Sequence, residues 1–452
     1  MSKRSRNRQR GRAKGAALPV IDAGGNVGAR PVALGMTTHI GATYKGASSD
    51  GPLVNWNVGT TEPNTAWAGQ ARTVTDRARD LVANDEQAAT AIERLVAMQV
   101  GVGFRFSPQH ELMAQHLKIT PEAASILADE IEAAWESWSN DRLCRGDWEE
   151  KLNFGQQLNV AARHFSIDGD AFAVLRLNKG TLPYGWKWRT SLQLLDPDRV
   201  ETPYGNFLNP NISGGIETDG RRPVAVHIRD AHPADARAWG QAQNFTRVPM
   251  REAWGRPIVV HAHARKRAGE MRGLSRFLPT LFAFCQLKGY KVTEVSAAKL
   301  NAMFGAHIKT TKLPGDAAEA LGVDNMISHA AARDEIYAGH EPSLPDGSRI
   351  PVLAPGDEFE LNAVPRHVAS FEGFVKTLGR GIAAALGVSG SEFLGDFTGM
   401  SFSTWRGEFL PIWQRVLQDR AILAQQFCDP ILLAVIEEGI ENGMIVKVEL
   451  EA

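Results

Sequence analysis

A change of hydrophobic patterning constrains the fold of this chain more than any other feature. From about residue 168 to 265 the chain consists of short β-branched or alternating runs separated by Gly, Asp and Pro, the pattern of strands and turns. On both sides of this block, apolar residues recur at helical spacing instead. Helical segments that flank one strand-rich block predict an α+β fold.

Helical patterning before the block starts near Arg72. Asn84 with Gln87 three residues later has the form of a capping box and predicts the start of a second helix, which ends near Gly101. Another helix is expected from Thr120, because this capping residue is followed by proline at the first helical position. One face of that helix is apolar and carries Leu127, Ile131, Trp135 and Trp138.

Asp147 and Glu150 predict the cap of the next helix, because they are again three residues apart. The apolar residues expected along that helix are Trp148, Leu152, Leu158 and Phe165.

Two helices separated by a mixed segment are expected after the strand-rich block. The first covers residues 275–304 and contains the interior glycine Gly289. The second covers residues 366–387, where apolar residues recur at near-heptad spacing. These residues are Val368, Phe371, Val375, Leu378, Ile382 and Leu386. Residues 305–363 between the helices include a hairpin-type turn at 354–358.

The C-terminal part is expected to form one long helix from Ser403 to about Gly439. Pro411 and Pro430 should kink or interrupt this helix, since proline removes a helical N–H and its ring clashes with the preceding turn. The stretch in front of it, "GDFTGMSFS" at residues 395–403, is rich in glycine and short polar residues.

Composition excludes several classes of protein. Apolar residues make up 43% of the 452 residues, enough for a well-buried core. The three cysteines lie far apart and suggest neither a disulfide framework nor a metal site, which favours a reducing place of synthesis. No secretion signal is expected, and "ILLAVI" is far shorter than the ~20 residues of a bilayer-spanning helix, so no membrane insertion is expected.

The net charge of −1 hides an asymmetry between the N-terminus and the rest of the chain. Residues 2–14 contain seven basic residues and no acidic one: Lys3, Arg4, Arg6, Arg8, Arg10, Arg12 and Lys14. Without them, 43 Lys and Arg stand against 51 Asp and Glu, a net charge of −8. We interpret residues 1–52 as a basic, Gly- and Ala-rich disordered arm, with contact to a polyanion as the functional alternative.

Common catalytic and metal-binding patterns are missing. The chain has no Gly-Lys dipeptide and therefore no P-loop. His110 and His116 lie six residues apart, roughly 240° around a helix, so they do not form a zinc-protease pair with Glu111. His261 and His263 would share one strand face, but no carboxylate or cysteine cluster accompanies them in the sequence. We expect no metal site and no cofactor.

A serine nucleophile at Ser401 is not supported by its surroundings. The glycine that a nucleophile elbow needs two residues later is missing, and no strand precedes the serine. Without a positioned base, an assortment of Asp and Ser is not a catalytic apparatus.

Seven segments, taken in order, resemble the lambda-type portal proteins of bacteriophages. The resemblance extends over residues 44 to about 430, and the segments are "YKGAS" (44–48), "RARDLVANDEQAATAIERLVAMQVGVGF" (77–104), "WESWSNDRLCRGDWEEKLNFGQQLNVAARHFSIDGDAF" (135–172), "LQLLDPDRV" (192–200), "GIETDGRRPVAVHI" (215–228), "RAGEMRGLSRF" (267–277) and "PGDEFELNAVPRHVASFEGFVKTLGRGIAAALGVSGSEFLGDFT" (355–398). The chain ends at Ala452, where many relatives continue, so the resemblance implies a short C-terminal crown.

The resemblance implies a portal fold with a defined domain order. Its parts would be a wing at 53–274 (helical at 72–166 and strand-rich at 168–265), a first stem helix at 275–304, a clip at 305–363, a second stem helix at 366–387, a tunnel loop at 389–402 and a long kinked helix with a short crown at 403–452. The apolar stripes of the stem helices would pack against neighbouring subunits.

The resemblance also implies a non-enzymatic function. The chain would form a ring, usually dodecameric, at one capsid vertex of a virion assembled in the bacterial host cytoplasm, and double-stranded DNA would pass through it. Its partners would be the terminase large subunit, head-completion or adaptor proteins and the major capsid protein. Whether the particle is an infectious phage or a gene transfer agent stays open.

Specific residues follow from that interpretation. The expected mobile tunnel loop would present short polar groups to DNA: Ser391, Asp396, Thr398, Ser401 and Ser403. Lys376 and Arg380 would make light phosphate contacts or, as an alternative, lie in solvent or in salt bridges between subunits.

Two other classes of function stay open. One is a serine-type hydrolase that uses Ser401 or Ser403 with Asp396 and a distant histidine. The other is a DNA-binding protein that acts through the basic N-terminal arm.

Overall fold

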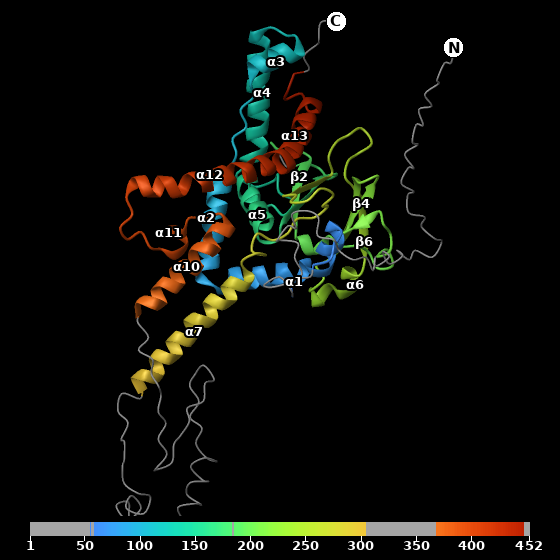
Figure 1. The fold of residues 1–452 in the computed structure, drawn as a ribbon. Helices are drawn as coiled ribbons and strands as arrows, with labels where there is room; N and C mark the ends of the chain where they lie inside the picture. Colours follow the sequence, from blue (N-terminus) through green and yellow to red (C-terminus); the bar gives the residue numbers. More distant parts are fainter. Residues whose placement is uncertain (1–54, 56–57, 183–184, 304–367, 447–452) are drawn as a thin grey trace, which may run out of the picture. The chain divides into compact units, whose positions relative to one another are not determined.

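A computed structural model describes residues 55, 58–182, 185–303 and 368–446 (Figure 1). The expected N-terminal arm at 1–52 lies outside the described residues, and so does the expected clip at 305–363 with its turn at 354–358.

Helices flank the strand-rich block on both sides, as the patterning predicts. The helices are α1 (Pro63–Asn84), α2 (Glu86–Gln99), α3 (His110–Leu117), α4 (Pro121–Ser139), α5 (Phe154–Ile167), α6 (Trp239–Ala242), α7 (Leu281–Met303), α10 (Val368–Leu386), α11 (Gly390–Leu394), α12 (Phe402–Leu423) and α13 (Asp429–Glu441), with 3₁₀ turns η3 (Pro197–Arg199) and η4 (Ala236–Ala238) and a π-helical turn η5 (Ala424–Cys428).

The strands fall between residues 170 and 263, which confirms the strand-rich block. They are β1 (Asp170–Leu177), β2 (Thr190–Leu195), β3 (Ile212–Ser213), β4 (Ile216–Asp219), β5 (Arg222–Arg229), β6 (Phe245–Pro249) and β7 (Val259–His263). One sheet has the order β2-β1-β7 and the other the order β3-β4-β5-β6. Every pairing between these strands is antiparallel. Together with the helices, the two sheets make the described fold a mixed helix-and-sheet architecture.

The cap at Thr120 is confirmed, because its side chain accepts a hydrogen bond from the backbone N–H of Ala123. The first helix starts earlier than the expected Arg72, after Glu62, whose carboxylate accepts from an N–H of the first turn. The cap of α2 is Asp85 and not Asn84, because Asp85 accepts from two backbone N–H groups.

The predicted cap at Asp147 is wrong. The chain beside Asp147 is bridged to β2, with the Trp148 N–H donating to the Leu192 carbonyl at 3.0 Å, so it is not free to turn into a helix. Asp147 instead accepts from backbone N–H groups of the following turn. The helix starts at Phe154, after a capping box formed by Asn153 and Gln156.

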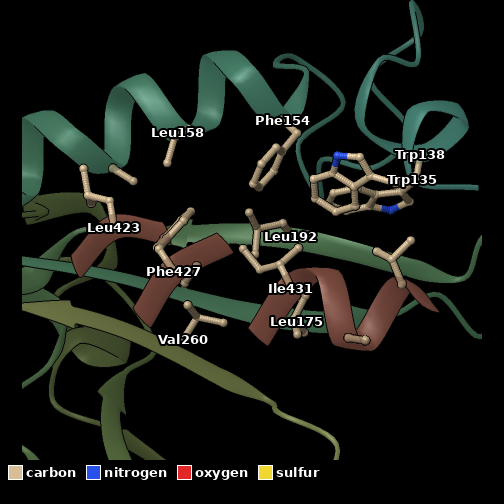
Figure 2. Packing of buried hydrophobic residues seen from close by; sticks show 14 of the residues in the cluster. Trp135, Trp138, Phe154, Leu158, Leu175, Leu192, Val260, Leu423, Phe427 and Ile431 are labelled. Carbon is tan, nitrogen blue, oxygen red and sulfur yellow. The ribbon is translucent and has the colours of Figure 1, made fainter. Parts of the chain in front are cut away.

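The larger apolar core lies between the first sheet, the helices before it and the C-terminal helices. Figure 2 shows Leu158 of α5, Leu192 of β2, Val260 of β7 and Phe427 of η5 pointing into the same space. The four apolar residues expected on α4 are all buried in this region: Leu127, Ile131, Trp135 and Trp138. Segments far apart in the sequence therefore share one core.

The C-terminal helix is interrupted at one of the two expected prolines. Pro411 lies inside α12, which continues through it. Before Pro430 the helix widens into η5, where the Asp429 N–H donates to the Ala424 carbonyl five residues earlier. Because proline cannot donate the next helical bond, one extra residue is accommodated in the turn before it. The widened turn buries Phe427 completely.

A second apolar cluster joins α1, α2, α7, α10 and α11. Helix α7 starts at Leu281 rather than 275, because residues 276–280 form turns. Helix α10 confirms the described part of the helix expected at 366–387. Ile382 and Leu386 of its apolar stripe are buried within the same chain, so this end of the stripe does not need a neighbouring subunit to cover it.

Gly169 and Gly273 mark the closest approach of two backbone segments. A Cβ atom on Gly273 would lie 1.9 Å from the carbonyl oxygen of Gly169, and Gly169 itself has a φ of +92°. Because backbone rather than a flexible side chain blocks the space, the obstruction cannot rotate away. Only glycine fits at this crossing between β1 and the segment that leads to α7.

We therefore expect Gly273→Ala to destabilise the protein by about 3 kcal/mol or more, since the added methyl group forces two backbone segments apart. The matched control is Gly289→Ala in α7, where a Cβ meets nothing within 4 Å. This control should stabilise by about 0.5–1 kcal/mol. Denaturant unfolding measures both changes, and equal stabilities for the two variants would contradict the close approach.

Candidate functional site

The segment expected as a mobile tunnel loop at 389–402 is partly helical. Ser389 caps the short helix α11, with its side chain accepting from the Glu392 N–H at 3.0 Å. Glu408 of α12 accepts from the Gly390 N–H at 2.6 Å and from the Ser391 hydroxyl at 3.0 Å. Ser391 is buried by these contacts, so we correct the expectation that it touches DNA.

Residues 395–401 form the turn between α11 and α12. Asp396 accepts from the Thr398 N–H at 3.0 Å and forms an ion pair with Lys376 Nζ at 2.8 Å. Ser401 caps α12 by accepting from the Thr404 N–H. Thr398, Ser401 and the neighbouring Ser403 are exposed. Within the chain, three of the five expected DNA-facing side chains are therefore open to solvent.

The two expected phosphate contacts differ in their surroundings. Lys376 of α10 is held by Asp396 and by Glu372, whose carboxylate lies 2.7 Å from Nζ. These hydrogen bonds raise the pKa of Lys376, first through Asp396 and then through Glu372. The pKa of Asp396 is lowered in turn, chiefly by Lys376. Arg380 is exposed and has no ion-pair partner among the described residues, so it is the better candidate for phosphate.

The hydrolase alternative finds no support in this geometry. The Ser401 hydroxyl lies 2.9 Å from the Thr404 hydroxyl, and Asp396 pairs with Lys376. Among the described residues, no histidine forms a hydrogen bond with Ser401 or Ser403. A nucleophile requires a base within hydrogen-bond reach, and this arrangement does not provide one.

A buried polar network that the sequence did not reveal surrounds Asp170 at the start of β1. Its carboxylate pairs with Arg272 Nε at 2.6 Å and His261 Nε2 at 2.8 Å, and accepts from the Gly273 N–H at 2.8 Å. Burial alone would raise the pKa of Asp170, but Arg272 and His261 outweigh it and hold this pKa below its usual value. The carboxylate is therefore a charged anchor inside the protein.

His261 and His263 share one strand face, as expected, but a carboxylate does accompany them. Asp170, His261 and His263 offer ligand atoms within 4.8 Å of one another. The two imidazoles are stacked, with ring centroids 4.4 Å apart and an interplanar angle of 10°. Lone pairs in parallel ring planes do not converge on one ion, and Arg272 already neutralises Asp170. The geometry fits an ion-pair network rather than a metal centre.

A second group, Asp196, Asp198 and His232, also brings ligand atoms together. Nδ1 of His232 accepts from the Ala234 N–H at 3.1 Å, so the proton of the neutral ring lies on Nε2, which faces Asp198. Arg79 of α1 pairs with both carboxylates. Neither nitrogen of the neutral His232 ring then offers a free lone pair to a metal, and Arg79 already supplies positive charge to the carboxylates. The contacts instead tie α1 to the β2–η3 region.

The helix α3 places His110, Glu111 and His116 on its exposed surface. In the part of the chain that the structure describes, no helix is both long and apolar enough to cross a bilayer.

Comparison with known proteins identifies the family. Residues 49–420 match the family model described as phage portal protein, lambda family. The portal protein of Escherichia phage N15 is 25% identical over 407 residues, covering 88% of this chain and 75% of the relative. Portal protein B of Escherichia phage lambda is 25% identical over 414 residues, covering 89% and 76%.

The chain is thus a phage portal protein, a head–tail connector of the virion. Within that class it belongs to the lambda family, whose model covers most of its length.

Solved structures that are similar to this chain come from gene transfer agent particles. The neck of a native particle, computed with C12 symmetry, gives 16% identity and a TM-score of 0.31 over 75% of this chain and 87% of that one. The virion of a native particle gives 14% identity and a TM-score of 0.32 over 78% and 93%. Scores of this size do not establish a shared overall arrangement.

The stacked histidines make stability depend on pH. Burial, followed by the nearby His261, lowers the pKa of His263 to about 3. Its Nδ1 has no hydrogen-bond partner among the described residues. The unfolded chain binds this proton at about pH 6.5. The unfolded state therefore takes up more protons than the folded state, and stability falls as pH falls through 6.5 toward 3.

The substitution His263→Phe keeps an aromatic ring at position 263 that can stack on His261, and it removes the group that titrates. Between pH 7 and pH 5 we expect the variant to lose about 1–2 kcal/mol less unfolding free energy than the wild type. The control is His110→Phe on exposed α3, which should leave the pH slope unchanged. Urea unfolding at several pH values measures the slope, and an unchanged slope for His263→Phe would disprove the assignment.

Proposed function

We propose that this chain assembles head to tail into a closed ring of twelve copies at one capsid vertex, and that double-stranded DNA passes through the ring. The observation that carries the proposal is the lambda-family match over residues 49–420. Twelve is the copy number that the family resemblance implies. The protein would act without enzymatic activity, and the terminase large subunit would supply the energy for packaging.

In this proposal, each described helix and sheet belongs to one part of a portal. The region up to about residue 274, with both sheets, is the wing, and α7 and α10 are the stem helices. Figure 1 shows α7 and α10 side by side, in agreement with the ring contact between Tyr290 of α7 and Phe374 of α10, whose ring centroids lie 4.5 Å apart. Residues 305–363 would form the clip. Helices α12 and α13 would lead to the crown.

Charge supports passage of DNA rather than tight binding. Outside residues 2–14 the net charge is −8 per copy, and this value is multiplied around a ring. A like-charged wall does not hold phosphates, so it favours sliding. In the proposal the exposed hydroxyls of Thr398, Ser401 and Ser403 contact passing DNA without holding it. The head-completion or adaptor proteins and the major capsid protein would bind outside the channel.

The ring itself is tested by negative-stain electron microscopy together with mass measurement of the purified full-length chain. Rings with a central hole wide enough for a duplex are expected. Deletion of residues 1–14 should leave the rings intact, since the basic arm is not needed for closure in this proposal. A chain that stays monomeric at micromolar concentration and in every salt condition would count against the ring.

Asp396→Lys tests whether residues 395–403 line the channel. The substitution adds positive charge and removes the partner of Lys376, so we expect packaging of DNA to fall while rings still form. Glu372→Gln is the control, because it removes the other partner of Lys376 without changing the segment. Packaging is measured as DNase-protected DNA per particle. Normal packaging by Asp396→Lys would remove the segment from the channel wall.

A further inference from the structure

Helix α12 carries a continuous row of aromatic rings along its first half, which is half-buried except at the exposed Phe402. Phe402, Trp405, Phe409 and Trp413 are spaced by three, four and four residues and therefore share one face. Successive rings are stacked, with centroids 6.2, 5.1 and 5.9 Å apart. Phe402 is 74% exposed. We call these four residues the aromatic ridge.

A hollow of about 230 Å³ lies on the seam between α7 and α10. Small side chains line most of it: Thr280, Ala283, Thr377, Gly381 and Ala385. Pro279, Phe374, Leu378 and Ile382 complete its apolar wall. The volume is below the roughly 300–1,000 Å³ of small-molecule pockets, so the hollow suits one or two side chains rather than a ligand. We call it the stem groove.

We infer that the aromatic ridge of one copy seats in the stem groove of the next copy around the ring. This inference rests on the ring of the proposed function and names the contact that closes it. A head-to-tail ring requires two different, complementary surfaces on every copy. The ridge projects and is aromatic, whereas the groove is hollow and lined by small residues, so the two are unlike and complementary.

The chain itself does not cover either surface among the described residues. Phe402 is mostly exposed, so the ridge does not fill the groove of its own chain. An exposed aromatic side chain and an unfilled apolar hollow are typical of an interface anchor and its pocket.

Two substitutions disable one surface each and leave the fold unchanged. Phe402→Asp replaces an exposed ring at the first residue of α12, where a negative charge also suits the helix N-terminus. Gly381→Trp fills the groove, since a Cβ on Gly381 meets nothing within 4 Å. The controls are Leu433→Asp, at a 59% exposed position on α13, and Gly69→Trp on α1, where a Cβ also meets nothing.

The experiment is to measure the mass of the assemblies formed by each full-length variant and by a mixture of the two. Each ridge or groove variant alone should remain monomeric, whereas both controls should form rings. A one-to-one mixture should form dimers and nothing larger. The intact ridge of Gly381→Trp enters the intact groove of Phe402→Asp, and the remaining two surfaces are both disabled.

Three results would overturn the inference. Rings formed by either variant would show that the altered surface is not needed. A mixture that stays monomeric would show that the ridge and groove do not bind each other, even if each is needed. If Gly381→Trp lost its rings while Phe402→Asp kept them, a segment other than the aromatic ridge would occupy the groove. A wild-type chain without rings would instead refute the proposed function, and this contact with it.

Discussion

The buried ion pair between Asp170 and Arg272 is the contact on which the rest of the described structure depends. Arg272 also donates to the carbonyls of Val200 and Gly214 at 2.9 and 2.8 Å. Its guanidinium lies 4.8 Å from the ring centroids of both Trp67 and Phe172. One side chain thus joins β1, helix α1 and the loops beside both sheets. Loss of either partner would leave an uncompensated buried charge, which typically costs about 3–5 kcal/mol.

The same segment connects this anchor to the helices proposed as the stem. Directly after Arg272, Gly273 passes against Gly169, and Arg276 then pairs with Asp419 of α12. Asp419 also accepts from Gln99 at the end of α2. A shift of the sheets would therefore reach the start of α7 and the C-terminal end of α12 together, because short buried contacts link them within a few residues.

The two surfaces proposed for function depend on different kinds of interaction, one ionic and one apolar. The turn at 395–401 is held by exposed contacts around Lys376, which screening by salt weakens. The proposed contact between the aromatic ridge and the stem groove would instead be apolar, and salt does not weaken apolar contact. In the proposal, a channel wall that releases DNA and an interface that stays closed have opposite requirements, and the two kinds of interaction would meet them separately.

Local signals in the sequence were sufficient to predict most helices and strands, but not every residue at which a helix begins. The strand-rich block and the cap at Thr120 could be predicted, because alternation and capping depend on residues close together in the chain. Asp147 and Asn153 both have cap-like spacing, and the sequence favoured the wrong one. The pairing of residues 146–148 with β2, more than forty residues away, decided between them.

The sequence by itself determined the α+β organisation and, through the order of seven short segments, the portal family. Tertiary structure alone decided which side chains are anchors and which are exposed. Asp170 meets His261 and Arg272, which lie 91 and 102 residues later, only because β1 pairs with β7. Ser391 is likewise buried because Glu408 folds back onto it from the next helix. Contacts of this range depend on packing, and neither residue type nor local spacing encodes them.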